Sequence, residues 1–313
     1  MRKIPYILAG SLALCAGNLQ AEDDVDVELQ NVGSEQMIDA DKKDDKAFRI
    51  SVRGDWIQET KIHKKKYRDE KLKFYEAEAE LQGVVYYNPC FEEGIGLGLS
   101  YNTVHLHWRG NPYFGESNFP QVSFSVAGFS KRAPGWLWQA KATINWQTQK
   151  KASFSDYTNY DLLLWGRYEY CPDVLWLHTG FVAQTGMKID RIFPIIGFDW
   201  VINDKWKLNA VFPLNLSIVY SFSDKWSIDL AGRLWSPRRR VKKHEELSEG
   251  LFRYRNSGAE LGLNYNTDWF RVNAHIGYAF GGVLTISDRN NKHKKHIDFD
   301  SSSYAGGELV FKF

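Results

Sequence analysis

The sequence predicts an all-β protein: a transmembrane up-and-down antiparallel β-barrel of about 14 strands, with 12 strands as the alternative. Three observations lead to this expectation. Most segments after residue 47 alternate apolar and polar residues, short and long connections alternate along the chain, and tryptophans stand at strand ends. No window of the 313 residues contains the ~20 consecutive apolar residues of a membrane helix.

The alternation is the signature of strands with two different faces. It is clearest over residues 193–229, where the same unit occurs twice: Phe-Pro, a series of alternating apolar residues, and then Asp-Lys-Trp. One segment departs from the pattern, because the apolar residues of 95–108 change parity after Tyr101. We expect a β-bulge near residues 102–103 to restore the register.

The connections between these segments alternate in length, which is typical of barrels with short periplasmic turns and long outer loops. The predicted short turns are 88–93, 132–135, 171–173, 203–205, 223–225 and 266–268. The predicted long loops are 60–71, 109–120, 150–158, 236–250 and 281–302. An even strand number would return both ends of the barrel to the periplasmic side. The break at Phe212-Pro213 would make the outer rim low at that point.

The N-terminus carries the pattern of a secretory signal peptide. Two basic residues precede an apolar run over 4–17, and the small residue Ala21 follows. We expect a signal peptide over residues 1–21 that is cleaved after Ala21, and delivery to the cell outer membrane. A lipoprotein signal at Cys15 is the alternative, but the bulky residue before that cysteine disfavours it.

Residues 22–46 are strongly acidic and contain few apolar side chains. Such a segment cannot bury enough surface to offset its ordering entropy, so we expect a disordered acidic periplasmic tail. The barrel would then occupy residues 47–313. Cys90 and Cys171 lie in two separate short turns, where an intramolecular disulfide is disfavoured by the short reach of the bond. Crosslinks to neighbouring proteins remain a hypothesis.

Aromatic residues mark the predicted membrane interface. Trp206, Trp226 and Trp269 each follow a short turn directly, where an indole can lie at headgroup depth with its N–H hydrated. Alternating aromatics close the chain on Phe313, and this ending resembles the recognition signal of bacterial outer-membrane proteins. The resemblance implies the barrel-assembly machinery as a partner through Phe313.

Signal peptide, barrel pattern and terminal Phe together resemble Gram-negative outer-membrane β-barrel proteins. The repeated Phe-Pro…Asp-Lys-Trp hairpins are similar to a family of outer-membrane barrels with no assigned function. The resemblance covers about residues 47–313 and implies the architecture, with outer-membrane lipid and lipopolysaccharide as surroundings. It implies no catalytic residues, because that family offers no catalytic motif.

If the apolar faces meet lipid, the opposite faces line the lumen. The lumen-facing charges that we predict are Arg49, Arg53, Glu76, Glu78, Glu80, Lys141, Arg167, Arg233, Glu260 and Arg271. They would form either a hydrated wall of cross-strand salt bridges or a constriction that selects solutes. A barrel of about 14 strands is wider than the 8-stranded kind that side chains fill, so a porin-like channel for small solutes is the leading function. Whether the lumen is open or plugged stays undecided at this point.

Basic residues gather in the predicted outer loops, where they either keep the loops soluble or bind surface polyanions such as lipopolysaccharide phosphates. These residues are Lys64, Lys65, Lys66, Arg238, Arg239, Arg240, Lys294 and Lys295. A structural or adhesive barrel is therefore the first alternative function. Nucleic acid is not expected as a partner, because no aromatic-lined basic groove is evident.

An outer-membrane enzyme is the second alternative. Ser, His and Asp residues are scattered, and no GxSxG or HExxH motif occurs, so we expect no enzymatic activity. His105 and His107 share a strand face, but no third ligand is evident near them. We therefore expect no metal site and no cofactor.

Overall fold

The computed structural model describes residues 47–63, 67, 70–148 and 153–313. Its strands are β1 (Phe48–Lys61), β2 (Lys71–Asn88), β3 (Glu93–Trp108), β4 (Asn118–Ser130), β5 (Trp136–Gln147), β6 (Thr158–Cys171), β7 (Leu175–Gly186), β8 (Ile189–Val201), β9 (Trp206–Phe212), β10 (Asn215–Ser221), β11 (Trp226–Trp235), β12 (Arg238–Arg240), β13 (Leu251–Asn266), β14 (Phe270–Ser287), β15 (Lys295–Phe299) and β16 (Ser302–Lys312). The expected signal peptide, the acidic tail and Lys64, Lys65 and Lys66 lie outside the described residues.

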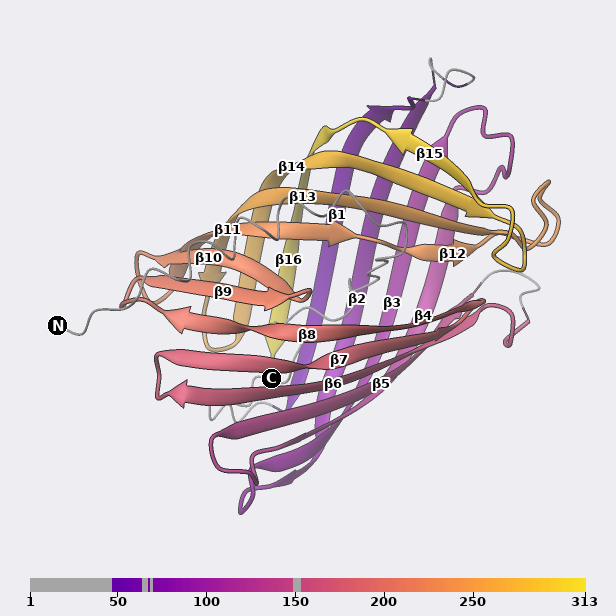
Figure 1. The fold of residues 1–313 in the computed structure, drawn as a ribbon. Coiled ribbons are helices and arrows are strands. Elements are labelled where there is room, and N and C mark those ends of the chain that lie inside the picture. Colours follow the sequence, from indigo (N-terminus) through magenta and orange to yellow (C-terminus); the bar gives the residue numbers. More distant parts are fainter. Residues whose placement is uncertain (1–46, 64–66, 68–69, 149–152) are drawn as a thin grey trace.

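Fourteen of these strands form one closed antiparallel ring, which confirms the predicted barrel (Figure 1). The ring runs from β1 to β11 in chain order and continues through β13, β14 and β16. It closes where β16 pairs with β1, with Arg49 opposite Lys312. Among the described residues, no helix is long and apolar enough to cross a membrane.

The remaining two strands extend the barrel at one end. β12 follows β11 and pairs with the start of β13. β15 precedes β16 and pairs with the end of β14. Two expected long loops are therefore partly strand: residues 281–302 contain the end of β14 and all of β15, and residues 236–250 contain β12. Parts of the two predicted loops form strands because both segments find hydrogen-bonding partners on neighbouring strands.

The two rims of the barrel differ as predicted. Residues 89–92, 131–135, 172–174, 202–205, 222–225 and 267–269 make the short-turn rim. The start of β1 and the end of β16 meet at this rim, where the Phe48 N–H donates to the Phe313 carbonyl at 2.9 Å. The opposite, long-loop rim is uneven: residues 213–214 join β9 to β10, and these two strands have only 7 residues each. The wall is low at this hairpin.

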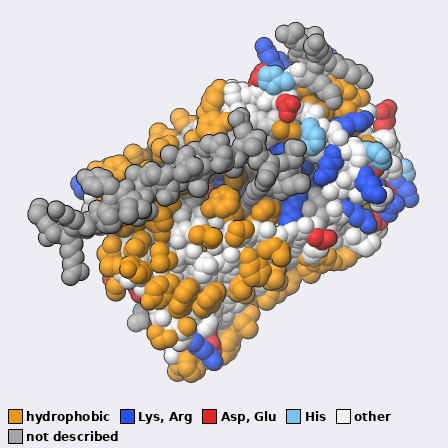
Figure 2. All heavy atoms as spheres, viewed as in Figure 1, with side chains coloured by type: hydrophobic (Ala, Val, Ile, Leu, Met, Phe, Trp, Pro, Cys, Tyr) orange, Lys and Arg blue, Asp and Glu red, His pale blue; other side chains and the backbone are white. Residues whose placement is uncertain are grey.

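Apolar side chains cover the outside of the barrel. Outward-facing residues on strands around the ring remain exposed, among them Trp56 at 53%, Leu99 at 52% and Ile196 at 66%. Figure 2 shows hydrophobic side chains over much of the visible wall, with charged side chains gathered towards one end. Such a belt is stable against hydrocarbon and unfavourable in water.

The expected bulge near residues 102–103 is absent. β3 pairs without interruption there, with Ala77 opposite Thr103 and Glu76 opposite Val104 on β2. Val104 and its inward neighbours Leu106 and Trp108 are buried, at 0%, 1% and 5% exposure. The prediction was wrong because it assumed a polar interior along the whole barrel. The change of parity instead marks the level at which the interior becomes apolar.

Candidate functional site

An aromatic cluster fills the interior towards the long-loop rim. Phe74 on β2 stacks on Tyr254 of β13, with ring centroids 4.1 Å apart. Phe119 on β4 meets Phe252 of β13 edge-on at 4.5 Å. Neither β2 nor β4 is a neighbour of β13 in the ring. Side chains from separate parts of the wall therefore meet inside the barrel. This outer cluster consists mainly of Leu72, Phe74, Leu106, Phe114, Phe119, Trp235, Phe252, Tyr254 and Phe299.

The connection between β11 and β13, residues 236–250, contacts distant parts of the wall at this end; we term it the closing segment. The Arg239 Nη2 group donates to the Asn102 Oδ1 atom on β3 at 2.6 Å. The Arg240 backbone N–H donates to the Gln147 Oε1 atom on β5 at 2.9 Å. The closing segment therefore contacts wall strands that are not neighbours of β11 or β13.

Arg238, Arg239 and Arg240 were expected in an exposed outer loop, and the structure contradicts this. Their exposed fractions are 3%, 3% and 2%. β12 continues the β11 ladder along β13, and contacts with β3, β5, β7 and residues 153–157 cover the three arginines. Some of their buried N–H groups donate hydrogen bonds to oxygen atoms of the protein. Arg238 Nη2, for example, donates to the Gly186 carbonyl at 3.2 Å. The polyanion-binding alternative thereby loses three of its basic residues.

The outer loops hold the closing segment from the other side. Arg240 Nε donates to the Asp156 carbonyl at 2.7 Å, and the Tyr157 hydroxyl donates to the Val241 carbonyl at 3.0 Å. Burial, together with the charge of Glu249, raises the pKa of Tyr157 to about 12. The tyrosine therefore remains a neutral donor at physiological pH.

A second loop contact involves residues 109–117. The Lys242 ammonium pairs with the Glu116 carboxylate at 2.8 Å, and the Leu247 N–H donates to the Tyr113 carbonyl at 2.9 Å. Burial raises the pKa of Glu116 above its usual value. The closing segment is thus attached at both of its ends by polar contacts.

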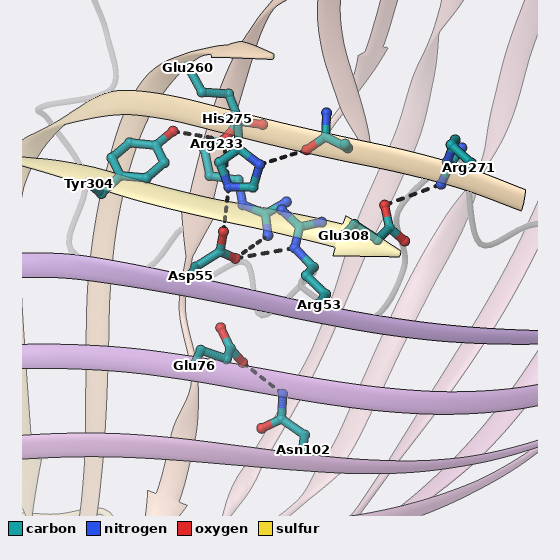
Figure 3. A network of polar contacts seen from close by, with 11 residues as sticks. Arg53, Asp55, Glu76, Asn102, Arg233, Glu260, Arg271, His275, Tyr304 and Glu308 are labelled. Carbon is teal, nitrogen blue, oxygen red and sulfur yellow. Dashed lines mark hydrogen bonds and ion pairs between the residues drawn. The ribbon is translucent and has the colours of Figure 1, made fainter. Parts of the chain in front are cut away.

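A charged cluster lies deeper in the barrel, around Asp55 (Figure 3). The Asp55 side chain is 2% exposed and accepts hydrogen bonds from Arg53 Nε at 3.2 Å and Arg233 Nη2 at 2.9 Å. Its other oxygen lies 2.7 Å from His275 Nε2. The Tyr304 hydroxyl completes the group by donating to Glu260 at 2.9 Å. One buried carboxylate thereby connects β1, β11 and β14.

Further ion pairs line the interior on either side of this cluster. Glu76 accepts a hydrogen bond from Asn102 Nδ2 at 2.9 Å, and Asn102 is also the acceptor for Arg239. Lys141 lies 3.7 Å from Glu80. Asn102 on β3 therefore links Glu76 of β2 to Arg239 of the closing segment.

The structure places all ten predicted lumen-facing charges on the inner face of the wall. It brings Arg53, Arg233 and Glu260 into the Asp55 cluster and pairs Arg271 with Glu308 at 3.2 Å. Arg49 lies at 3.8 Å from the same glutamate, and Arg167 lies over the Trp176 ring. The prediction missed the roles of Asn102 and Tyr304. The parity change after Tyr101 was the available signal for Asn102, because it marks the border of the polar interior.

The other predicted residues lie outside this interior. Trp206, Trp226 and Trp269 are exposed at the short-turn rim, at 44%, 40% and 57%. Lys294 and Lys295 are exposed, and the Lys295 ammonium lies over the Tyr113 ring at 4.8 Å.

Two pairs of potentially reactive side chains, two histidines and two cysteines, lie outside the interior. His105 and His107 point to the outside of the barrel, with ring centroids 6.4 Å apart. Cys90 and Cys171 are free thiols, exposed at the short-turn rim. Within the described residues, no three His, Cys, Asp or Glu side chains gather where they could hold a metal ion.

A closed antiparallel barrel with an apolar exterior and a charged interior is a transmembrane β-barrel of the outer-membrane type. Residues 174–310 match a family model described as a domain of unknown function, DUF6268. An uncharacterized protein of Chlamydia pneumoniae is 26% identical over 201 residues, which is 63% of this chain and 62% of the relative. An uncharacterized protein of Chlamydia trachomatis serovar D is 22% identical over 264 residues, covering 78% of this chain and 81% of the relative. The chain thus spans less than two thirds of the first relative's length.

Solved structures with a similar outline include an outer membrane channel, COG4313, from Pseudomonas putida F1. It has 9% identity and a TM-score of 0.47, covering 86% of this chain and 96% of that one. The translocator domain of the autotransporter NalP from Neisseria meningitidis has 10% identity and a TM-score of 0.35, with coverages of 85% and 88%. These sequence identities and TM-scores are too low to support an inference about function.

Proposed function

We propose that this protein is an outer-membrane channel for small solutes, and that the described state is its closed state. The closing segment and the outer cluster would block the lumen at the long-loop rim. The observation that carries the proposal is the position of the closing segment. Its strand β12 continues the β11 ladder along β13, and the segment also reaches other parts of the wall by hydrogen bonds to Asn102, Gln147 and Gly186.

The size of the barrel supports passage. Side chains fill barrels of about 8 strands, whereas wider ones leave a cavity or channel unless a plug occupies it. In this 14-stranded ring the proposed plug is the closing segment together with the outer cluster, all from the same chain. The wall around it carries charges of both signs, which suits hydrated solutes of either charge and argues against strong ion selectivity.

The energetics favour displacement of the closing segment over rearrangement of the wall. A hydrogen bond from a charged group contributes about 1.5–3 kcal/mol, and a neutral one about 0.5–1.5 kcal/mol. Apart from the short β12–β13 ladder, the closing segment is held by a limited set of such bonds. The wall strands are held by continuous ladders, as between β2 and β3. Loss of the first set leaves the barrel intact.

The same proposal places the protein in the outer membrane, among lipopolysaccharide and other outer-membrane lipids. Phe313 would be the contact for the barrel-assembly machinery at this location. The exposed apolar belt is consistent with it.

Conductance in planar lipid bilayers tests the channel. Wild-type protein should conduct rarely, and the double variant R239A/R240A should conduct more often, because it removes the side-chain hydrogen bonds to Asn102 and to the Asp156 carbonyl. Lys243→Ala is the matched control, since Lys243 is an exposed cation of the same segment. Heat-modifiable mobility on SDS gels shows that each variant is folded. Folded wild-type and double-variant barrels that both fail to conduct would refute the proposal.

A further inference from the structure

The outer surface of the barrel is hollowed across β4 to β8, near the long-loop rim. The hollow has a volume of about 500 Å³. This value lies within the range of about 300–1,000 Å³ typical of small-molecule sites. It lies on the lipid-facing side of the wall, apart from the closing segment and the Asp55 cluster.

The strand registers explain the hollow. One cross-strand row on the outer face consists of Val126, Ala142, Leu162, Ala183 and Ile192, each paired with the next. Two of its five side chains are reduced to methyl groups. The adjacent row consists of Phe124, Ile144, Tyr160, Thr185 and Asp190, paired in the same way. The alanines therefore form the floor of the hollow, and the larger residues form its sides.

The lining is almost entirely apolar at its centre and polar at one end. Leu162, Tyr160 and Ile192 are exposed at 46%, 42% and 72% within the apolar belt. At the end towards the β7–β8 turn, the Thr185 hydroxyl donates to the Asp190 carboxylate, and Asp190 remains exposed. An apolar furrow with an acceptor at its outer end is complementary to a chain with a donor at its head.

We propose that this hollow binds a single hydrocarbon chain whose polar head carries a hydrogen-bond donor, an ammonium or a hydroxyl, placed beside Asp190. The chain lies over Ala142 and Ala183, where it makes contacts that a convex barrel surface does not offer, and many weak dispersion contacts add up. The carboxylate attracts an ammonium head and repels a carboxylate head. This site does not depend on the channel proposal, because it lies outside the wall.

Native mass spectrometry of the folded, full-length protein tests the site with three probes of equal chain length: dodecylamine, dodecanol and dodecanoate. Wild-type protein should retain one molecule of dodecylamine, with dodecanol next and dodecanoate weakest. Ala183→Phe should reduce retention of dodecylamine by about tenfold, which is 1.4 kcal/mol in affinity. Ala79→Phe is the matched control, because Ala79 is an exposed, lipid-facing alanine on β2, outside the hollow.

Asp190→Asn provides the second readout and should make retention of dodecylamine and dodecanoate nearly equal. If Ala183→Phe does not fold, as judged by heat-modifiable mobility, Ala142→Leu takes its place. Equal retention in the hollow and control variants would mean general adsorption to the belt and would overturn the site. A head-group preference that survives in Asp190→Asn would overturn the role of that residue. A protein that binds dodecylamine but never conducts would refute only the channel.

Discussion

The Asp55 carboxylate on β1 accepts a hydrogen bond from the Arg233 guanidinium of β11 at 2.9 Å, although three wall strands separate β1 from β11. A contact between such strands must pass through the interior. Asp55 therefore holds two parts of the wall together from inside, and also compensates Arg53 and contacts His275. Residues that are 178 positions apart in the chain form this link.

Asp55→Ala should destabilise the barrel by about 3 kcal/mol, because it leaves the half-buried Arg53 and Arg233 without their shared, buried counter-charge. The urea midpoint of folded protein in detergent, followed by gel mobility, measures the loss. The matched control is Asp224→Ala in an exposed turn of the short-turn rim, where we expect a change within about 0.5 kcal/mol. Equal midpoints for the two variants would show that Asp55 has no structural role.

Phe74→Ala should also cost about 3–5 kcal/mol, because it removes a ring that is 1% exposed and stacked on Tyr254. It should in addition raise conductance, since it thins the outer cluster. Phe280→Ala removes the same ring from a lipid-facing position that is 60% exposed and serves as the control. A Phe74→Ala variant with wild-type stability would contradict the packing described for the outer cluster.

Acid should loosen the closing segment. The Ser153 hydroxyl, followed by the charges of Arg289 and Arg240, holds the pKa of the Asp156 carboxyl below its usual range. A carboxyl whose pKa is lowered on folding stabilises its contacts at a pH above the unfolded value of about 3.9, and this contribution is lost as the pH falls through the folded pKa. Asp156 pairs with Arg289 at 3.2 Å beside the Arg240 anchor.

The contribution of Asp156 to channel open time should therefore appear only as the pH falls below about 3.9, where Asp156 becomes protonated and the open time rises. Asp156→Asn should show the longer open time at pH 7 and a smaller response to acid. The exposed turn variant Asp224→Asn should respond to pH as the wild type does. If Asp156→Asn and the wild type have the same pH response, another group controls the closing segment.

Trp226→Ala should lower stability through loss of the contact with Tyr265, whose ring centroid lies 4.6 Å away. Aromatic pairs of this kind contribute about 0.5–1.5 kcal/mol beyond the area that they bury. Trp226→Phe keeps an aromatic ring and should recover most of the loss, although it removes the indole N–H. Equal stability of the two variants would locate the contribution in the N–H at the interface instead.

The lipid-facing pattern was readable from sequence because it is a local property. Each outward residue, such as Leu99 or Ile196, meets hydrocarbon regardless of what lies across the barrel, so period-2 alternation reports it directly. The inward residues were harder to interpret. Val104 and Arg239 each depart from the expected environment, since their neighbours come from distant strands.

The sequence alone predicted the architecture of this protein: an up-and-down barrel of about 14 strands, its short-turn rim, the aromatic residues at that rim and the wall that carries charge. These features follow from alternation, turn residues and chain length, which act between residues close in sequence. Only the tertiary structure decided what fills the barrel. The partner of Arg239 is Asn102, and that of Phe119 is Phe252, because ring closure brings these residues together across the interior. No local pattern encodes such long-range pairs.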